Sequence, residues 1–292
     1  MTTTRPMGAR DEVRLGPEDR PELPSRRFPA VVRVLLVPVM MVVMAFSPFI
    51  FILIPGFVDF TRGITDPVVG AAVTLPMHVM CAVVAVLLVW LCMRFIDRRP
   101  LRETGLGVNA RTVPLFLLGT VIATVIVLVV AVPLGLAGQL RAPDPTDGPL
   151  WLALLLGVSQ GFVLQAFPEE YLWRGYLLQT LRTRAEVAVL ISAGLFALMH
   201  LPSEGGQQNA LEHVMYLAVP FGFALLAGAL VLRTGSMWAA VGVHGGVHLG
   251  TMILAHAFGF GEGPAYWLIG GAIFTIVGLA VMRTPRTARR AA

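Results

Sequence analysis

The sequence predicts an all-α protein, a polytopic membrane helix bundle of about eight transmembrane helices. Three observations support this fold class. The chain of 292 residues is 56% hydrophobic and only 13% charged, which is more apolar than one soluble core of this size would bury. Its apolar residues form long runs, and its arginines gather between these runs. A lipid bilayer is therefore the expected surroundings of most of the chain.

The apolar runs define the expected helices. A spanning helix needs roughly 20 mostly apolar residues. The candidates lie at about 34–58, 68–93, 113–137, 149–167, 186–201, 211–232, 236–257 and 265–282. The first run contains Pro38 and Pro48, and we still expect it to stay helical because backbone groups in lipid must be hydrogen-bonded internally.

The arginines predict the topology independently. All 22 basic residues are arginine, and the connections predicted on one side carry all of them except Arg62, Arg141 and Arg174. Cytoplasmic connections retain positive charge, so both termini are predicted to be cytoplasmic. The same distribution explains the net charge of +5 without a nucleic-acid partner. The abundance of Arg, Ala, Val and Gly and the absence of Lys favour a bacterial plasma membrane protein.

Four regions are expected along the chain. Residues 1–30 are polar and rich in proline, which predicts a disordered cytoplasmic tail and not a signal peptide. Residues 31–148 hold three N-terminal transmembrane helices, and 149–257 form a core of four helices. Residues 258–292 contain the last helix and a basic cytoplasmic tail.

Two adjacent acids continue the fourth apolar run. Each charge costs roughly 2.5 to 3.5 kcal/mol near the middle of a bilayer, so Glu169 and Glu170 need compensation. Glu170 and Arg174 are four residues apart, which places them on one helix face as an ion pair. Glu169 points about 100° away and lacks that partner. The simpler interpretation is that both acids mark the cytoplasmic end of this helix.

Three histidines fall at a similar depth. His200 ends the fifth run, and His244 and His248 share one face of the seventh helix. At 1.5 Å per residue from the nearest cytoplasmic arginines, Glu169, His200 and His248 lie roughly 22 to 24 Å deep and His244 roughly 16 Å deep. We therefore expect these groups to converge. Two glycines between His244 and His248 would let another backbone or a substrate approach closely.

The fourth helix raises a difficulty of length. A straight helix over 149–184 would span roughly 54 Å, which exceeds the thickness of a bilayer. A bend near Pro168, or a continuation into the cytosol, is therefore expected. Two other histidines, His78 and His256, stand singly in apolar runs, and we expect a neighbouring carbonyl to satisfy each.

In combination, these elements resemble the CAAX-processing and bacteriocin-immunity (CPBP, or Abi) intramembrane proteases. That family shows Glu-Glu-x-x-x-Arg, then Phe-x-x-x-His, then His-x-x-x-Asn on successive core helices. The resemblance covers about 149–257. The matching residues in order are Glu169, Glu170, Arg174, Phe196, His200, His244 and, in place of the asparagine, His248.

The resemblance implies an intramembrane protease of the glutamic type, without a metal cofactor, that hydrolyses a peptide bond of a membrane-associated or lipidated peptide or protein. Glu169 and His200 would activate water, and His244 and His248 would stabilise the oxyanion. Glu170 and Arg174 would support them. An imidazole at 248 can also donate a hydrogen bond, but its tautomer and charge now matter.

Two alternatives stay open on the residues themselves. Glu169, His200, His244 and His248 are a plausible zinc set, although Gly245 takes the place of the glutamate in His-Glu-x-x-His. Intramembrane charges also line transport pathways, so a transporter, a scaffold or an inactive relative is the second alternative. A cluster would favour the enzyme, and a string of groups across the bilayer would favour transport. The sequence leaves open the oligomeric state and whether the substrate is a prenylated, a bacteriocin-related or another peptide.

Overall fold

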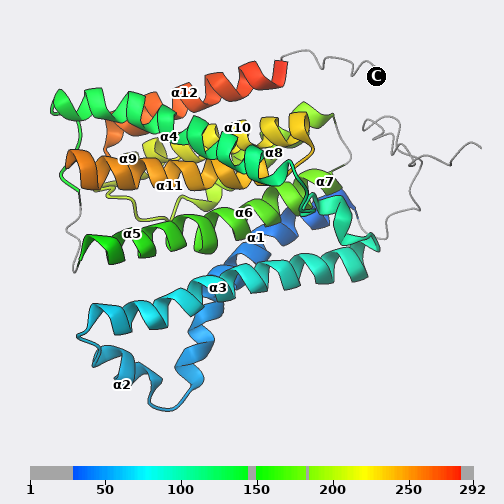
Figure 1. Ribbon diagram of the computed structural model, residues 1–292. Coiled ribbons are helices and arrows are strands. Elements are labelled where there is room, and N and C mark those ends of the chain that lie inside the picture. The colour runs from blue at the N-terminus through cyan, green and yellow to red at the C-terminus, as the bar shows by residue number, and fades with distance from the viewer. Residues whose placement is uncertain (1–28, 144–148, 182–183, 284–292) are drawn as a thin grey trace, which may run out of the picture.

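The computed structural model describes residues 29–143, 149–181 and 184–283 and confirms the all-α helix bundle; no strand occurs in these ranges (Figure 1). The predicted N-terminal tail lies outside them except for its last two residues, and so does the basic C-terminal tail after Arg283. The helices are α1 Ala30–Phe46, α2 Phe57–Arg62, α3 Pro67–Leu91, α4 Thr112–Leu136, α5 Leu150–Val158, α6 Phe167–Glu170, α7 Leu178–Thr180, α8 Ala185–Met199, α9 Ala210–Tyr216, α10 Ala218–Thr234, α11 Trp238–Phe258 and α12 Pro264–Arg283.

Short helical segments of other types connect or extend these helices. Their bounds are Ser47–Leu53 and Leu101–Thr104 for the 3₁₀ type, and Cys92–Asp97, Ser159–Ala166 and Tyr171–Leu177 for the π type.

Seven helical stretches in the described residues are long and apolar enough to cross a membrane, where the sequence predicted about eight. They are Ala30–Leu53, Pro67–Asp97, Thr112–Leu136, Leu150–Thr180, Ala210–Thr234, Trp238–Phe258 and Pro264–Arg283. The remaining candidate is α8, whose 15 residues extend only about 22 Å and fall short of the hydrocarbon thickness. The protein is an integral membrane protein. Its helix α8 belongs to the bundle but is shorter than the seven spanning stretches.

The first predicted helix is wrong in its extent. α1 begins at Ala30, and its continuation ends before Gly56, whose φ of +78° lies in the left-handed region. The run 34–58 is therefore interrupted, and α2 follows the turn as a separate short helix. The earlier start also places Arg33 inside α1, where it is buried and donates to Asp97 at 2.5 Å, and not before the first helix as predicted.

The fourth helix is longer than the predicted 149–167. Helical structure runs without a break over Leu150–Thr180, roughly 46 Å, and Figure 1 shows it crossing the length of the molecule from α5 to α7. Pro168 does not end it. Two π-helical segments flank the glutamate pair on α6 instead. Such segments are uncommon and occur frequently at functional sites, because they rotate the side chains that follow them.

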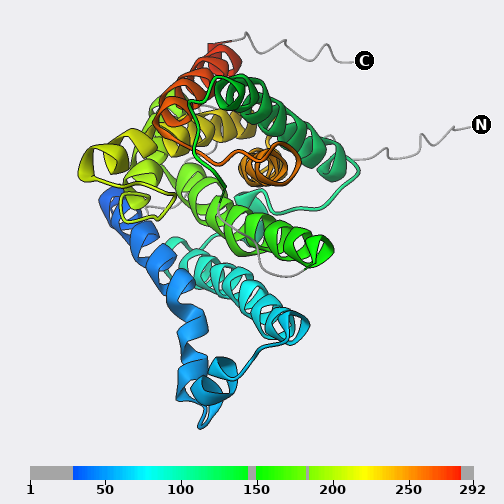
Figure 2. The ribbon, with the colours of Figure 1, turned by 90° about the vertical axis from the view of Figure 1, so that its left-hand side faces the viewer.

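The helix α11, which carries two of the histidines, packs directly on α4. A Cβ at Gly242 would lie 2.1 Å from the carbonyl oxygen of Phe116, and one at Gly119 would lie 2.2 Å from that of Ala239. Thr124 also donates to the carbonyl of Gly246 at 2.9 Å. Small residues thus bring the two backbones into contact, as is common between membrane helices. In Figure 2, α4 and α11 lie together on one side of the α5–α7 helix, and α1 and α3 lie on the other.

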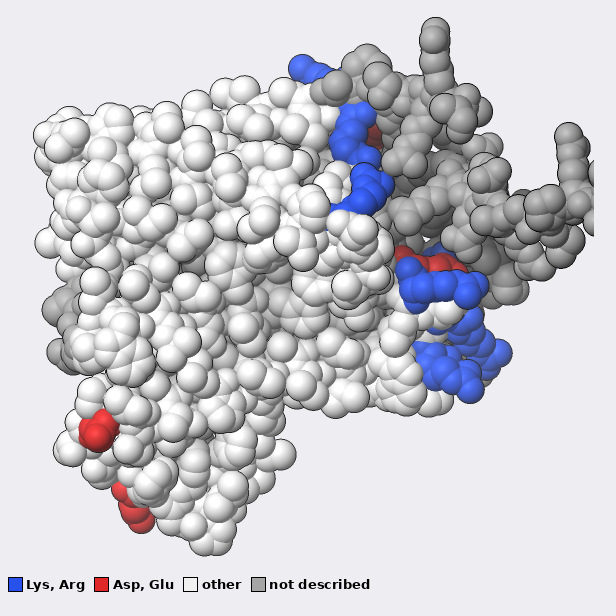
Figure 3. Space-filling view, viewed as in Figure 1, with Lys and Arg blue, Asp and Glu red and all other residues white. Residues whose placement is uncertain are grey.

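Basic side chains gather at one end of the bundle (Figure 3). The first described residues of α1 and the end of α12 lie at this same end (Figure 1). This arrangement agrees with the alternation of arginines along the sequence. The assignment of this end to the cytoplasm stays a prediction.

The contact between α4 and α11 leads to a first prediction. Gly242→Ala would drive a methyl group into the Phe116 carbonyl and should destabilise the fold by about 1 to 3 kcal/mol, the usual cost of overpacking. The matched control is Gly194→Ala on α8, where a Cβ meets no atom within 4 Å. Thermal unfolding in detergent should show a lower Tm for the first variant and an unchanged or higher Tm for the second. Equal Tm values would contradict the close packing.

Candidate active site

The two glutamates on α6 lie inside the bundle and do not mark the end of a helix. Glu169 is 7% exposed, and Glu170 and Arg174 are fully buried. The predicted ion pair is present, with Arg174 Nη1 3.1 Å from Glu170 Oε1. Arg174 also donates to the Ala224 carbonyl of α10 at 2.8 Å. One guanidinium thus compensates the buried carboxylate and ties the α6 region to α10.

The same oxygen of Glu170 reaches a histidine of α11. His244 Nδ1 lies 3.2 Å from Glu170 Oε1. An ionised carboxylate only accepts hydrogen bonds, so Nδ1 is assigned the proton and donates it to Glu170. In the neutral ring, Nε2 then carries a lone pair. Glu170 thereby connects two helices and sets the tautomer of His244.

Phe196 of α8 is the apolar centre of this cluster. Its ring centroid lies 4.8 Å from the Arg174 guanidinium carbon, a cation–π contact. The centroids of His200 and His244 lie 4.5 Å and 5.7 Å from it. Phe223 of α10 packs on the same rings. Its ring centroid lies 5.5 Å from that of Phe196 and 4.8 Å from that of His244. Sequence reasoning did not single out Phe223, because one phenylalanine in an apolar helix carries no distinguishing signal.

His200 follows the last turn of α8. Its Nδ1 lies 2.8 Å from the Phe196 carbonyl oxygen, which can only accept. In the neutral ring, Nδ1 therefore donates and Nε2 is left as an acceptor. The His200 ring packs on Phe196, whose ring also contacts His244.

His248 lies one turn along α11 from His244, and the two rings stack at 5.2 Å. Glycines let the His248 region of α11 pack closely against the long helix that carries the two glutamates. A Cβ at Gly161 would lie 2.7 Å from the Cβ of His248, and one at Gly245 would lie 2.1 Å from the ring of Phe162. The predicted close approach at the glycines beside His244 is therefore present, and the neighbour it admits is another helix.

Glu169 stands beside this cluster with a different environment. Its Oε2 atom is buried and has no hydrogen-bond partner among the described residues. Glu170 Oε2 is also buried without a partner in the described part of the chain, so the two acids differ in the Oε1 of Glu170, which binds Arg174 and His244. The structure thus brings Glu170, Arg174 and the three histidines together, and it leaves the neighbouring carboxylate of Glu169 unpaired.

The two isolated histidines have different partners. His256 Nδ1 lies 2.9 Å from the Met252 carbonyl, as expected. His78 Nδ1 instead lies 3.0 Å from the hydroxyl of Ser159, so the expected carbonyl partner is wrong. Among the described residues, no group of three or more His, Cys, Asp or Glu is arranged to hold a metal ion. A zinc site on the candidate residues would first require their side chains to move toward one another.

The buried ion pair leads to a second prediction. Arg174→Met leaves Glu170 as an uncompensated buried charge and should lower the free energy of unfolding by about 3 to 5 kcal/mol. Arg174→Met combined with Glu170→Gln removes both charges and should recover part of this loss. Arg111→Met, at an exposed arginine, is the control and should leave the Tm unchanged. A double variant less stable than Arg174→Met would contradict the compensation.

Comparison with known proteins finds a family model that is similar to the part of the chain holding this cluster. Residues 148–250 match the model of the family described as type II CAAX prenyl endopeptidase Rce1-like. The match confirms the resemblance to the CAAX proteases that the three motifs indicate, and it supports a protease, hence a hydrolase. No curated protein matches the chain. The matched stretch contains all the candidate site residues, Glu169, Glu170, Arg174, His200, His244 and His248.

Proposed function

We propose that the protein is an intramembrane endopeptidase that hydrolyses a peptide bond of a membrane-associated or lipidated peptide. One observation carries the proposal. Glu170 is shared by Arg174 and His244 inside the bundle, while the adjacent Glu169 keeps a buried oxygen without a partner. A carboxylate without an internal partner, adjacent in the chain to the acid that binds His244, is suited to accept a proton from water.

Glu169 and His200 are the proposed pair that activates the water. Hydrogen bonding to the Phe196 carbonyl leaves Nε2 of neutral His200 as an acceptor. The unpaired oxygen of Glu169 is a second acceptor. Two acceptors on different helices can orient one water and remove its proton as oxygen attacks the peptide carbonyl. The proton can then pass to the leaving amine, so no net charge accumulates.

His244 and His248 are the proposed oxyanion-stabilising groups, but their tasks differ. The bond from Nδ1 to Glu170 means that His244 donates from Nε2 only as the imidazolium, whose charge Glu170 would offset. His248 carries no such constraint from a carboxylate, and its neutral ring can donate a hydrogen bond. We therefore assign the ground-state donor to His248, at the position where the resembling family more often has asparagine.

Clustering of the groups favours an enzyme over a transport pathway. Glu170 contacts His244, His244 stacks on His248, and Phe196 contacts both His200 and His244. The polar side chains thus form one compact group, whereas a transporter would distribute them along a path across the bilayer. We propose a glutamic-type reaction without a metal, with zinc as the alternative.

The substrate class follows from the surroundings and from the family. The family description names a CAAX prenyl endopeptidase. Spans surround the site, so the substrate must reach it from the bilayer or from the end of the bundle. We propose a lipidated or otherwise membrane-anchored peptide, cleaved in a plasma membrane with the basic end of the bundle in the cytoplasm.

A third prediction tests the proposed base. Glu169→Gln keeps the shape and removes the charge, so it should abolish hydrolysis of a prenylated reporter peptide in liposomes while leaving the Tm unchanged. Glu186→Gln, at an exposed acid in the first turn of α8, is the matched control and should retain full activity. Hydrolysis by the Glu169→Gln variant at the parental rate would rule out Glu169 as the base.

The same assay separates the two mechanisms. Activity that persists after dialysis against a strong chelator supports the metal-free reaction. Activity that is lost and then restored by added zinc supports the zinc alternative.

A fourth prediction concerns the donor at position 248. His248→Asn keeps a hydrogen-bond donor and should retain most of the turnover. His248→Leu removes the donor and should lower kcat by about 10²- to 10³-fold, the usual cost of losing one oxyanion donor. Steady-state kinetics on both variants measure this difference. Equal losses in the two variants would contradict the donor role.

A further inference from the structure

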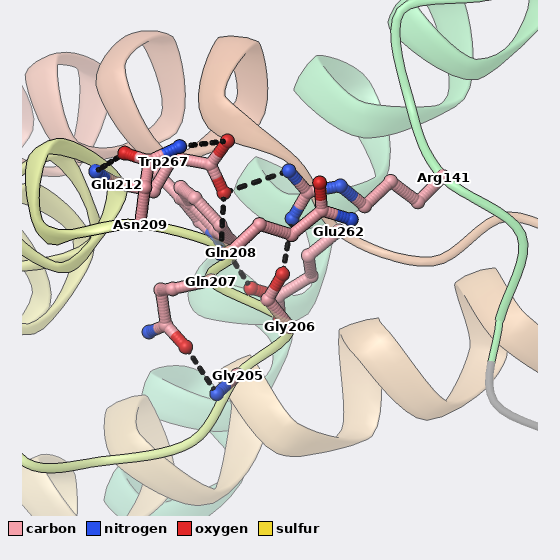
Figure 4. A network of polar contacts seen from close by, with 9 residues as sticks. All are labelled: Arg141, Gly205, Gly206, Gln207, Gln208, Asn209, Glu212, Glu262 and Trp267. Carbon is pink, nitrogen blue, oxygen red and sulfur yellow. Dashed lines mark hydrogen bonds and ion pairs between the residues drawn. The ribbon is translucent and has the colours of Figure 1, made fainter.

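Arg141 makes an unusual set of contacts in the connection between α4 and α5 (Figure 4). Its Nη2 lies 2.7 Å from Glu212 Oε2, and its Nη1 donates to the carbonyl of Gly206. Its guanidinium carbon lies 5.5 Å from the ring centroid of Trp267. One side chain therefore contacts a carboxylate, a carbonyl and an aromatic ring that belong to three parts of the chain. We refer to Arg141, Glu212, Glu262 and Trp267 as the polar clasp.

The backbone of Arg141 is fixed to the connection between α11 and α12. Gly261 donates its amide hydrogen to the Arg141 carbonyl at 2.8 Å, and Arg141 donates to the Glu262 carbonyl at 3.4 Å. The indole of Trp267 donates to Glu262 Oε2 at 2.9 Å, which holds this connection against α12. Arg141 is thus an anchored residue, and the groups that it binds are held in place by it.

The polar clasp holds the chain between α8 and α9. Glu212 Oε2 accepts from the Gln208 amide at 2.9 Å as well as from Arg141. Asn209 caps α9 by accepting from the Glu212 amide at 3.1 Å. With the bond from Arg141 to Gly206, these contacts fix the path of residues 205–209. That stretch has no regular secondary structure of its own, so its path depends on these contacts.

One end of the held segment reaches the proposed active site, and the other end packs on the polar clasp. At one end, His200 follows α8 and accepts a hydrogen bond from the amide of Ser203 on its carbonyl. At the other end, the Tyr216 ring packs edge-on against Trp267 at 5.6 Å, and Gly205 lies against it. The segment from 200 to 216 thus begins at His200 and ends against Trp267 of the polar clasp.

We infer that Arg141 is a positioning residue, which fixes the segment from His200 to Tyr216 and so sets His200 relative to Glu169. The inference rests on the proposed function. Arginine suits this task because its planar group can bind a carboxylate and a carbonyl while stacking on a ring. The side chains of Arg141 and Glu212 are only 28% and 13% exposed, so water screens their attraction less than it screens an open surface pair.

The test is the turnover of Arg141→Met in the full-length protein in liposomes. This change keeps the length of the side chain and removes its charge and hydrogen bonds. A misplacement of His200 should lower kcat by about 10- to 100-fold and leave KM nearly unchanged, because a residue that acts only by positioning makes no contact with the substrate. Arg62→Met, at an exposed arginine ending α2, is the matched control and should keep the parental kcat.

Two further variants separate positioning from general loss of structure. Arg141→Lys keeps the charge but not the forked geometry, so its kcat should lie between those of the parent and of Arg141→Met. Exchanging the charges with Arg141→Glu and Glu212→Arg together should recover part of the kcat that either single change loses. All rates are compared per folded molecule, well below each variant's Tm.

Either of two outcomes would overturn the inference. One is a parental kcat for Arg141→Met while Glu169→Gln is inactive. The other is a loss of activity that merely follows the folded fraction in every variant. Failure of the proposed function has a different signature, which is retained hydrolysis by Glu169→Gln.

Discussion

Everything in the candidate site depends on how one buried carboxylate is compensated. Glu170 is fully buried in a bundle with little polar surface, where an unpaired charge would be costly. Arg174 and His244 both bind its Oε1, and Arg174 binds the Ala224 carbonyl in turn. Glu170 and Arg174 therefore join the α6 region to α10 and α11, and Phe196 adds α8 to them.

The close packing of the α6 region, α8, α10 and α11 accounts for the other features of the site. Glycines in α4, α11 and the π-helical segment let the backbones approach to within contact, which places His248 beside the helix of the glutamates. The π-helical segments on both sides of α6 are part of the same long helix, so the glutamate pair sits in its least regular part. Arg174 and His244 bind Oε1 of Glu170, whereas the neighbouring Glu169 has a buried Oε2 without a partner among the described residues and no ion pair to Arg174. The two adjacent acids therefore have different surroundings, and the roles proposed for them rest on this difference.

The sequence was sufficient for the local pairing and insufficient for the contacts between distant segments. The ion pair of Glu170 and Arg174 depends on helix spacing alone, and it was predicted. The motif order predicted the family, because three weak patterns in series are rarely coincidental. The interruption of the first run at Gly56 was missed, because an apolar composition does not reveal a turn. Phe223 and the polar clasp around Arg141 were also missed, since both require knowing which connections lie side by side.

A structure of the protein with a bound peptide aldehyde is the decisive measurement for the proposed site, because the hydrated aldehyde imitates the tetrahedral intermediate. We expect one oxygen of the hydrate within about 3 Å of Glu169 and of His200 Nε2, and the other within hydrogen-bond reach of His248. Binding of the aldehyde away from these residues would contradict the proposed roles. So would a metal ion coordinated between Glu169 and the histidines.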